Sequence, residues 1–235
     1  IAVMYVNNET GVIQPIEEIS KIARANGICF FCDATQAAGK INIDVNQLGI
    51  DFLCLSGHKM YGPKGVGALF IGQTFQKGKV VSQIHGGGHE NAKRSGTLNV
   101  PGIIGLGKAS EIAAQEIKGE YSNIIGSLRD ELEAELLRLP NTYVNGSIET
   151  RVFNTSNICI KGQDANVLIG RLKEIAVSNG SACSSAIMEP SHVLKAMGVS
   201  DEDAFSSIRF SLGKSNTIDQ LKIVVNKIKE FSIYA

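Results

Sequence analysis

An excess of charge of one sign is missing from this sequence. Its 235 residues hold 23 Lys and Arg against 23 Asp and Glu, so the formal net charge is +0. Balanced charge without a basic run argues against a protein that binds nucleic acid. Long apolar runs are also missing: no stretch approaches the length of a membrane-spanning helix, and no signal peptide is visible. We therefore expect no binding to a membrane.

Cysteines are few, and their number is odd. Five cysteines in a chain of this size are not the even set that a disulfide framework requires. We expect a reducing compartment, the cytoplasm. The composition, 43% hydrophobic and 20% charged, is that of a globular protein with a sizeable core. The first residue is not Met and opens a strand-like run, so we expect the chain to begin inside a fold.

Strand-like and helix-like segments alternate along the chain. In the first half, strands are expected at residues 1–6, 28–32, 52–55 and 67–71, and a helix at 16–25. A helical region from 102 to about 139, with a break near Gly126, separates this half from a second α/β unit. There we expect strands at 155–160, 175–178 and 207–211, and helices capped by Asp164 and Thr217 and near 193–197. The alternation predicts an α/β fold with parallel strand pairs.

A lysine follows the strand at 52–55, in a turn rich in glycine and proline. Ligands of open α/β sheets bind where strands end. A desolvated lysine at that place, Lys59, can lose its proton and form a Schiff base with an aldehyde cofactor. The alternative is a solvated surface lysine in a strand connection.

Asp33 ends another strand, 26 positions before Lys59. If the two strands are neighbours, both side chains reach one crevice. An aspartate there can keep a pyridinium nitrogen protonated, which makes the ring of pyridoxal phosphate (PLP) an electron sink. A carboxylate that caps the following turn is the other interpretation.

Cys183 differs from the other four cysteines, because it lies in a loop of small polar residues rather than in an apolar run. Such a setting suits a thiolate nucleophile, although an incidental loop cysteine is the alternative. The remaining four we expect to be buried structural residues: Cys29, Cys32, Cys54 and Cys159.

Arg209 lies inside an apolar strand and needs an anionic partner. A two-pronged grip on a substrate carboxylate and a structural ion pair both satisfy that need. The glycine-rich stretch at 83–97 contains His85 and His89, but no third metal ligand is near, so this stretch with Arg94 suits an anion such as phosphate better.

Seven short motifs are spread over essentially the whole chain. They are Asn-Asn-Glu-Thr-Gly at 7–11, Asp-Ala-Thr-Gln at 33–36, Ser-Gly-His-Lys at 56–59, Gly-Gly-Gly-His-Glu at 86–90, Arg-Ser-Gly-Thr at 94–97, Gly-Ser-Ala-Cys at 180–183 and Ser-Ile-Arg-Phe-Ser at 207–211. In order and spacing they resemble the cysteine desulfurase family, and the Ser-Ala-Cys-Ser-Ser loop resembles its NifS/IscS-type members. These are PLP enzymes of the class V aminotransferase group with the fold-type I architecture.

The resemblance implies an organisation in two domains. Residues 1–112 would be the C-terminal part of the PLP-binding large domain, a three-layer αβα structure that is incomplete here. Residues 113–235 would be a smaller α/β domain that carries the cysteine loop. Family members have a substantial portion before the strand that begins this sequence, including a phosphate-binding loop and a histidine that stacks on the cofactor. We expect that portion to be absent from these residues.

The resemblance also implies a role for each motif residue. Lys59 would bind PLP as a Schiff base and then move protons, and Cys183 would take the sulfur of L-cysteine as a persulfide, leaving alanine. Arg209 and Asn8 would bind the substrate. The residues implied to contact the cofactor are Asn8, Asp33, Gln36, Ser56, His58, Lys59 and Thr97.

The resemblance further implies partners. Thr97 would bind the phosphate of the other subunit's cofactor, which requires a homodimer. An iron–sulfur scaffold or another acceptor protein would receive the sulfur, and Cys183 could transiently bridge a cluster there, with no intrinsic metal site. The alternatives are a selenocysteine lyase, a class V aminotransferase, or a truncated chain without activity that only dimerises or binds a scaffold.

Overall fold

The computed structural model describes residues 1–76, 80–180 and 189–232. The chain divides into two compact units. Unit 1 contains Ile1–Val6 and Gln14–Gly119, and unit 2 contains Asn7–Ile13 and Glu120–Ala235. The short segment Asn7–Ile13 therefore belongs to the second unit, although it lies between two parts of the first.

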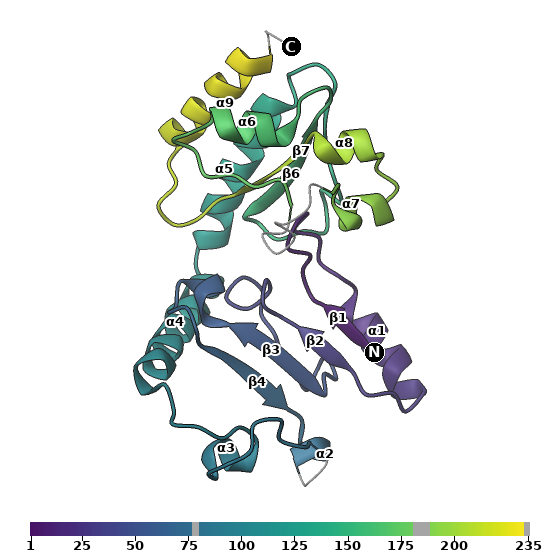
Figure 1. Ribbon diagram of the computed structural model, residues 1–235, viewed down its shortest axis with the longest axis vertical. Helices are drawn as coiled ribbons and strands as arrows, with labels where there is room; N and C mark the ends of the chain where they lie inside the picture. Colours follow the sequence, from purple (N-terminus) through teal and green to yellow (C-terminus); the bar gives the residue numbers. More distant parts are fainter. Residues whose placement is uncertain (77–79, 181–188, 233–235) are drawn as a thin grey trace. The chain divides into compact units, whose positions relative to one another are not determined.

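Unit 1 is built on a four-stranded sheet in the order β1-β2-β3-β4 (Figure 1). The strands are β1 (Ala2–Met4), β2 (Phe31–Asp33), β3 (Phe52–Ser56) and β4 (Gly67–Ile71). β1, β2 and β3 run parallel, whereas β4 runs antiparallel to β3. The register pairs Asp33 with Cys54, two residues before β3 ends. Since parallel strands end at the same edge of a sheet, residues that follow β2 and β3 share one edge.

The helices of unit 1 are α1 (Ile16–Ala25), α2 (Gln73–Gln76), α3 (His89–Ala92) and α4 (Val100–Lys118). α1 buries Ile16, Ser20 and Ala23 on one face, as the spacing of its apolar residues predicts. It ends before Gly27, whose φ of +63° places it in the left-handed region that favours glycine. A 3-10 helix, Gly57–Met60, directly follows β3.

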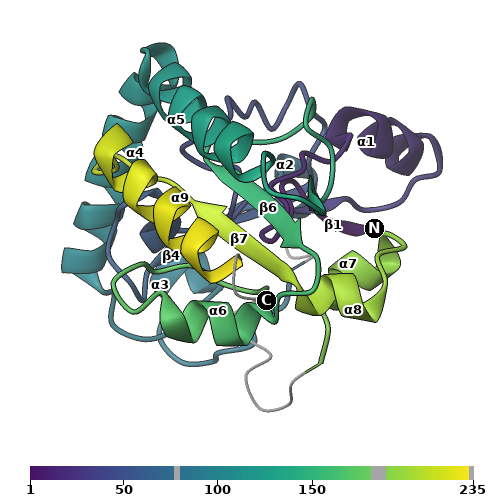
Figure 2. The same ribbon diagram turned by 90° about the horizontal axis from the view of Figure 1, so that it is seen from above.

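Unit 2 has an antiparallel three-stranded sheet, β5 (Thr142–Val144), β6 (Thr155–Ile160) and β7 (Ser207–Ser211). Its helices are α5 (Tyr121–Leu136), α6 (Ala165–Arg171), α7 (His192–Ala196), α8 (Asp201–Phe205) and α9 (Ile218–Ser232). All six residues of β6 are buried. Figure 2 shows α5 and α9 side by side over the sheet, and apolar residues of both helices join those of β6 and β7 in one core.

A buried ionic cluster joins α5 to the sheet of unit 2. Both carboxylate oxygens of Glu133 accept hydrogen bonds from Arg151, at 2.7 and 2.8 Å. Ser156 on β6 donates a third, at 2.6 Å. Glu133 is 8% exposed and the Arg151 side chain 4% exposed, so each charge is compensated inside the protein.

Two expectations about local structure were wrong. The helical region breaks at Gly119, whose backbone is extended, while Gly126 is buried inside α5. Residues 175–178 form no strand: Ile175 donates its N–H locally to Leu172, and only Ser178 pairs, as a single bridge to Arg209.

The cysteines also differ in part from expectation. Cys29 is exposed because β2 begins two residues later, at Phe31, and Cys54 is half-buried. Cys32 and Cys159 are buried as expected. Within the described residues, none of the helices is both long enough and apolar enough to cross a membrane.

Candidate functional site

Asp33 ends β2 in unit 1 and is half-buried. One of its carboxylate oxygens accepts the N–H of Thr35 at 2.9 Å, which fixes the turn that follows the strand. The Ala34 N–H donates to the carbonyl oxygen of Cys54 on β3, at 2.9 Å. Asp33 thus caps its turn, as one interpretation predicted, and still has a second oxygen at the end of two parallel strands.

The lysine turn begins where β3 ends. Ser56 Oγ and His58 Nδ1 lie 2.8 Å apart, and the Lys59 side chain projects from the 3-10 helix, whose residues Gly57 and Met60 are buried. Lys59 is exposed, so the expected desolvation of its amine is not found in this structure.

Close contact with α4 fixes the position of this turn. A Cβ on Gly62 would lie 3.2 Å from the Ala109 Cβ, and a Cβ on Gly105 only 2.5 Å from the Pro63 ring. Both glycines are therefore needed for the approach of helix and turn. The contact holds the backbone that presents Lys59 rigidly, although the lysine side chain itself is solvated.

Lys40 is a second lysine beside this turn, and no role was predicted for it from the sequence. Its ammonium donates to the carbonyl oxygen of Gln36 at 3.0 Å. Burial, and secondly the charge of Lys59, lower the pKa of Lys40 to about 8. The Coulombic effect shows that the two amines are near one another, and the hydrogen bond ties Lys40 to the half-buried Gln36.

Thr97 lies in the segment before α4 and is exposed. In the neighbouring glycine-rich stretch, Ser95 Oγ donates to the Gly87 carbonyl at 2.5 Å and Arg94 donates to the Gly96 carbonyl at 3.2 Å. No hydrogen bond or ion pair among the described residues joins Thr97 to the other predicted residues of unit 1. The structure thus brings together Asp33 and the lysine turn, but not Thr97.

In unit 2, Arg209 lies on β7 and contacts the segment that carries Asn8. Its Nη1 donates to the Asn8 carbonyl oxygen at 2.7 Å. Burial lowers the pKa of the Arg209 guanidinium, while the negative charge of Glu9 acts in the opposite direction. In the described part of the chain, no side chain forms an ion pair with Arg209. A guanidinium has five N–H donors in a geometry that suits an anion.

Asn8 belongs to a loop that is held to the sheet of unit 2. The Asn7 side chain accepts the N–H groups of Glu9 and Thr10, at 2.9 and 3.0 Å, which closes an Asx turn. Asn157 on β6 donates to the Glu9 carbonyl oxygen at 3.2 Å. The loop that presents Asn8 is therefore positioned by hydrogen bonds to buried residues. Cys183, the predicted nucleophile, lies outside the described residues.

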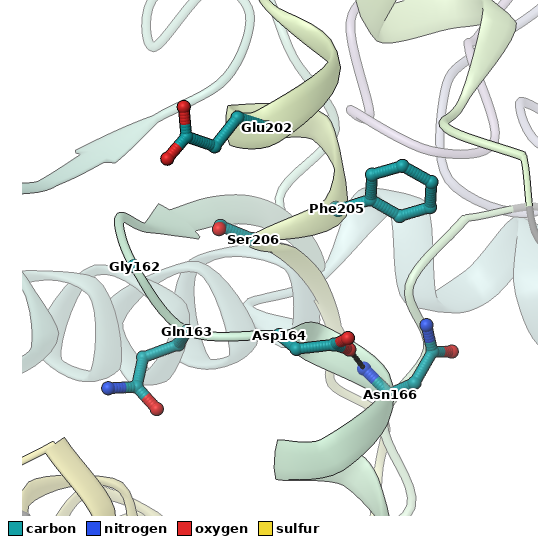
Figure 3. A pocket seen from close by; sticks show the side chains of 7 residues that line it. All are labelled: Gly162, Gln163, Asp164, Asn166, Glu202, Phe205 and Ser206. Atoms are coloured by element: carbon teal, nitrogen blue, oxygen red, sulfur yellow. Dashed lines mark hydrogen bonds between the residues drawn. The ribbon is translucent and has the colours of Figure 1, made fainter. Parts of the chain in front are cut away.

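A pocket of about 380 Å³ is present in unit 2 (Figure 3). It is lined by Gly162, Gln163, Asp164, Asn166, Glu202, Phe205 and Ser206. None of the predicted site residues is among them. The Asp164 carboxylate is engaged in capping α6, since it accepts the N–H of Asn166 at 2.8 Å.

Comparison with known proteins shows close relatives over almost all of this chain. It is 47% identical over 231 residues to "Cysteine desulfurase IscS" of Anaeromyxobacter sp. (strain Fw109-5), covering 98% of this chain and 57% of that protein. The chain thus spans little more than half the length of that relative. The X-ray structure of a NifS-like protein from Rickettsia africae ESF-5 matches with a TM-score of 0.88 and 38% identity, over 97% of this chain and 60% of the other.

A third similar protein is "SspA in complex with cysteine", with a TM-score of 0.74 and 36% identity over 90% of this chain and 58% of the other. These likenesses confirm the predicted α/β fold, the fold-type I architecture of NifS-like proteins. The model of the aminotransferase class-V family matches residues 1–224. This chain therefore belongs to the aminotransferase class-V family.

Proposed function

We propose that the protein to which these residues belong is a PLP-dependent cysteine desulfurase, which removes sulfur from L-cysteine and gives L-alanine and a persulfide on Cys183. One observation carries the proposal. Asp33 and the turn with Lys59 follow neighbouring parallel strands, where a cofactor ring would find a carboxylate and an amine. The cysteine desulfurases among the relatives and the SspA complex with cysteine support this choice of reaction.

The residues of unit 1 fit PLP in their chemistry. The second oxygen of Asp33 can accept a pyridinium N–H, and the paired Ser56 hydroxyl and His58 imidazole can donate to a phosphate. Lys59 would attach the cofactor through its exposed amine. When bound, PLP would supply an electron sink for the substrate Cα. We also propose that Gln36 contacts the cofactor, and that residues 1–112 act as part of the PLP-binding domain.

Arg209 would hold the carboxylate of L-cysteine. The hydrogen bond from its side chain to the Asn8 carbonyl oxygen orients the guanidinium, which has further N–H groups for a two-pronged grip. Asn8 is half-buried in the same loop and would contact the substrate with its amide. The lysine amine of Lys59 would take the Cα proton of the substrate and return it to the product.

Cys183 would capture the sulfur atom, and residues 113–235 would be the domain that presents it. We propose that an acceptor protein, such as an iron–sulfur scaffold, then takes the sulfur. We further propose a homodimer in which Thr97 contacts the other subunit's cofactor. The cysteines for which the structure gives positions are all free thiols, which suits a reducing compartment such as the cytoplasm.

The test uses the visible spectrum and the products. We expect an absorbance band in the visible range when the protein is incubated with PLP, and loss of that band in Lys59→Ala. With L-cysteine and a thiol reductant added, alanine should form and the reductant should release the persulfide sulfur as sulfide; Cys183→Ala should stop both while leaving the band intact. A variant that still transfers amino groups without Cys183 would instead identify an aminotransferase. Loss of the band from this chain but not from a longer form would show that further residues complete the site.

A further inference from the structure

Glu9 is a buried carboxylate to which the proposed reaction gives no role. Only 2% of the residue is exposed. Its Oε2 accepts a hydrogen bond of 2.5 Å from the hydroxyl of Ser191, a residue 182 positions further along the chain. A buried charge is costly unless it is paired or hydrogen-bonded. The contact therefore fixes Ser191 with respect to the loop that carries Asn8.

Ser191 connects the Glu9 carboxylate to the first turn of α7. It is the residue that caps the helix, and its Oγ accepts the N–H of Leu194 at 3.2 Å. The same oxygen thus donates its proton to Glu9 and accepts from the first turn of α7. Where α7 begins is consequently set by the carboxylate.

A further neighbour of the Glu9 carboxylate is Gly180. Gly180 is buried, and a Cβ added to it would lie 3.6 Å from Glu9 Oε2. The Ser178 hydroxyl donates to the Gly180 carbonyl at 3.0 Å, and the Arg209 N–H donates to the Ser178 carbonyl at 2.6 Å. Gly180 is therefore held between the carboxylate and the strand that carries Arg209.

Gly180 and Ser191 stand on either side of the residues that include Cys183. We propose that Glu9 is a positioning residue: its carboxylate fixes both ends of the segment that carries Cys183 relative to Arg209. The significance of this arrangement for catalysis rests on the proposed desulfurase function. The contacts themselves belong to unit 2 alone, so their loss can be tested without cofactor or substrate.

The negative charge of Glu9 also acts on Arg209, the residue proposed to bind the substrate carboxylate. Its carboxylate is close enough to Arg209 to favour the charged guanidinium, and no hydrogen bond between the two side chains is found in the described part of the chain. Two variants separate the effects. Glu9→Gln keeps an oxygen that accepts from Ser191 and removes the charge, whereas Glu9→Ala removes both.

The first test is hydrogen exchange followed by mass spectrometry, on protein without PLP or L-cysteine. We expect Glu9→Ala and Ser191→Ala to raise exchange of residues 192–195 about tenfold, the factor that follows from losing one charge-assisted hydrogen bond. Glu9→Ala should also raise exchange of residues 178–180, which lose their packing contact with the carboxylate. Glu9→Gln should raise it less. Unchanged exchange at these ends in Glu9→Ala, or an equal rise throughout unit 2, would overturn the proposal.

Glu133→Gln provides a matched control. Glu133 is also a buried glutamate of unit 2 that accepts a serine hydroxyl, Ser156 Oγ at 2.6 Å. Its replacement should raise exchange in α5 and β6 without a preference for residues 178–180 and 192–195. A general loss of stability is thereby distinguished from a local loss of position.

The second test is kinetic and uses the holoenzyme. Glu9→Ala should lower kcat for alanine formation about tenfold or more with a smaller change in KM, because the nucleophile rather than the carboxylate grip is misplaced. An increase in KM alone would contradict the positioning role. Since the exchange test needs no turnover, local release of the two ends in a protein without desulfurase activity would support the role of Glu9 and refute only the proposed function.

Discussion

Replacement of Lys40 by Met should stabilise unit 1 near neutral pH. Burial, and secondly the charge of Lys59, lower the pKa of Lys40 from 10.5 to about 8. Each unit of difference between the pKa of Lys40 in the unfolded and in the folded chain corresponds to about 1.4 kcal/mol, so the protonated lysine lowers the unfolding free energy by about 3 kcal/mol at pH 7. Its hydrogen bond to the Gln36 carbonyl oxygen stabilises the folded state by about 1 kcal/mol. The net gain expected for Lys40→Met is about 2 kcal/mol at pH 7.

The sign of the pH dependence follows from the same values. Between pH 8 and 10.5 the unfolded chain binds the proton and the folded one does not, so the wild type becomes more stable as pH rises. Below pH 8 both states are protonated and the full cost applies. The advantage of Lys40→Met should therefore shrink above pH 8 and reach about zero near pH 9.5.

Urea unfolding measures this difference. The sequence contains no tryptophan, so peptides of β2 and β3 are followed by pulse labelling and mass spectrometry at pH 7, 8.5 and 9.5. The control is Lys21→Met, which removes an exposed lysine of the same unit that pairs with Glu17. It should leave the unfolding free energy almost unchanged at all three pH values, because an exposed ion pair contributes little to stability. If Lys40→Met lowers stability at pH 7, or if its effect is the same at all three pH values, the assigned burial of Lys40 is refuted.

Three further predictions concern unit 2 and the lysine turn. Glu133→Ala should lower the unfolding free energy by about 3–5 kcal/mol, because it leaves the buried charge of Arg151 without a partner. The double variant Glu133→Leu with Arg151→Met removes both charges and should recover most of that loss. Equal urea midpoints for the single and the double variant would contradict this. Burial acts to raise the pKa of Glu133, but hydrogen bonds from Arg151 and Ser156 outweigh it and hold that pKa below its ordinary value, so this stabilisation should be lost as pH falls below about 4.5. Arg209→Lys should raise KM for L-cysteine by about tenfold or more with a smaller effect on kcat, since the two-pronged grip is lost, and steady-state kinetics that show only a kcat defect would oppose it. His58→Ala should weaken PLP binding about tenfold or more in equilibrium dialysis, the range for one hydrogen bond to a charged group, and unaltered binding would remove His58 from the phosphate site.

Much of the fold was readable from the sequence because local patterns agree with tertiary packing. β4, β6 and β7 and α1 have the predicted bounds, since each combines a clear apolar period with turn or capping residues at its ends. The prediction of a strand at residues 175–178 was wrong because of tertiary structure. An apolar run becomes a strand only if a neighbouring strand pairs with it along its length, and here only Ser178 pairs, with Arg209.

The candidate site was predictable in part for similar reasons. The position of Asp33 and of the lysine turn follows from strand ends, which the sequence marks. The burial of Lys40 and Glu9 could not be predicted in this way, because both residues lie in polar or small-residue stretches and are covered by segments distant in sequence. The partner of Glu9 is 182 residues away, beyond the reach of any local pattern.

The division of the chain has a consequence for how the protein is made. Unit 2 includes Asn7–Ile13, which is synthesised more than a hundred residues before the rest of that unit. Its pairing with residues such as Asn157, a separation of 148 positions, must await the arrival of β6 from the ribosome. Contacts of such high sequence separation slow folding, because a long loop must close before they form. Expression of residues 120–235 alone would therefore leave the Asn157 amide without its acceptor, and the slow step of refolding should be the capture of this early segment by a nearly complete second unit.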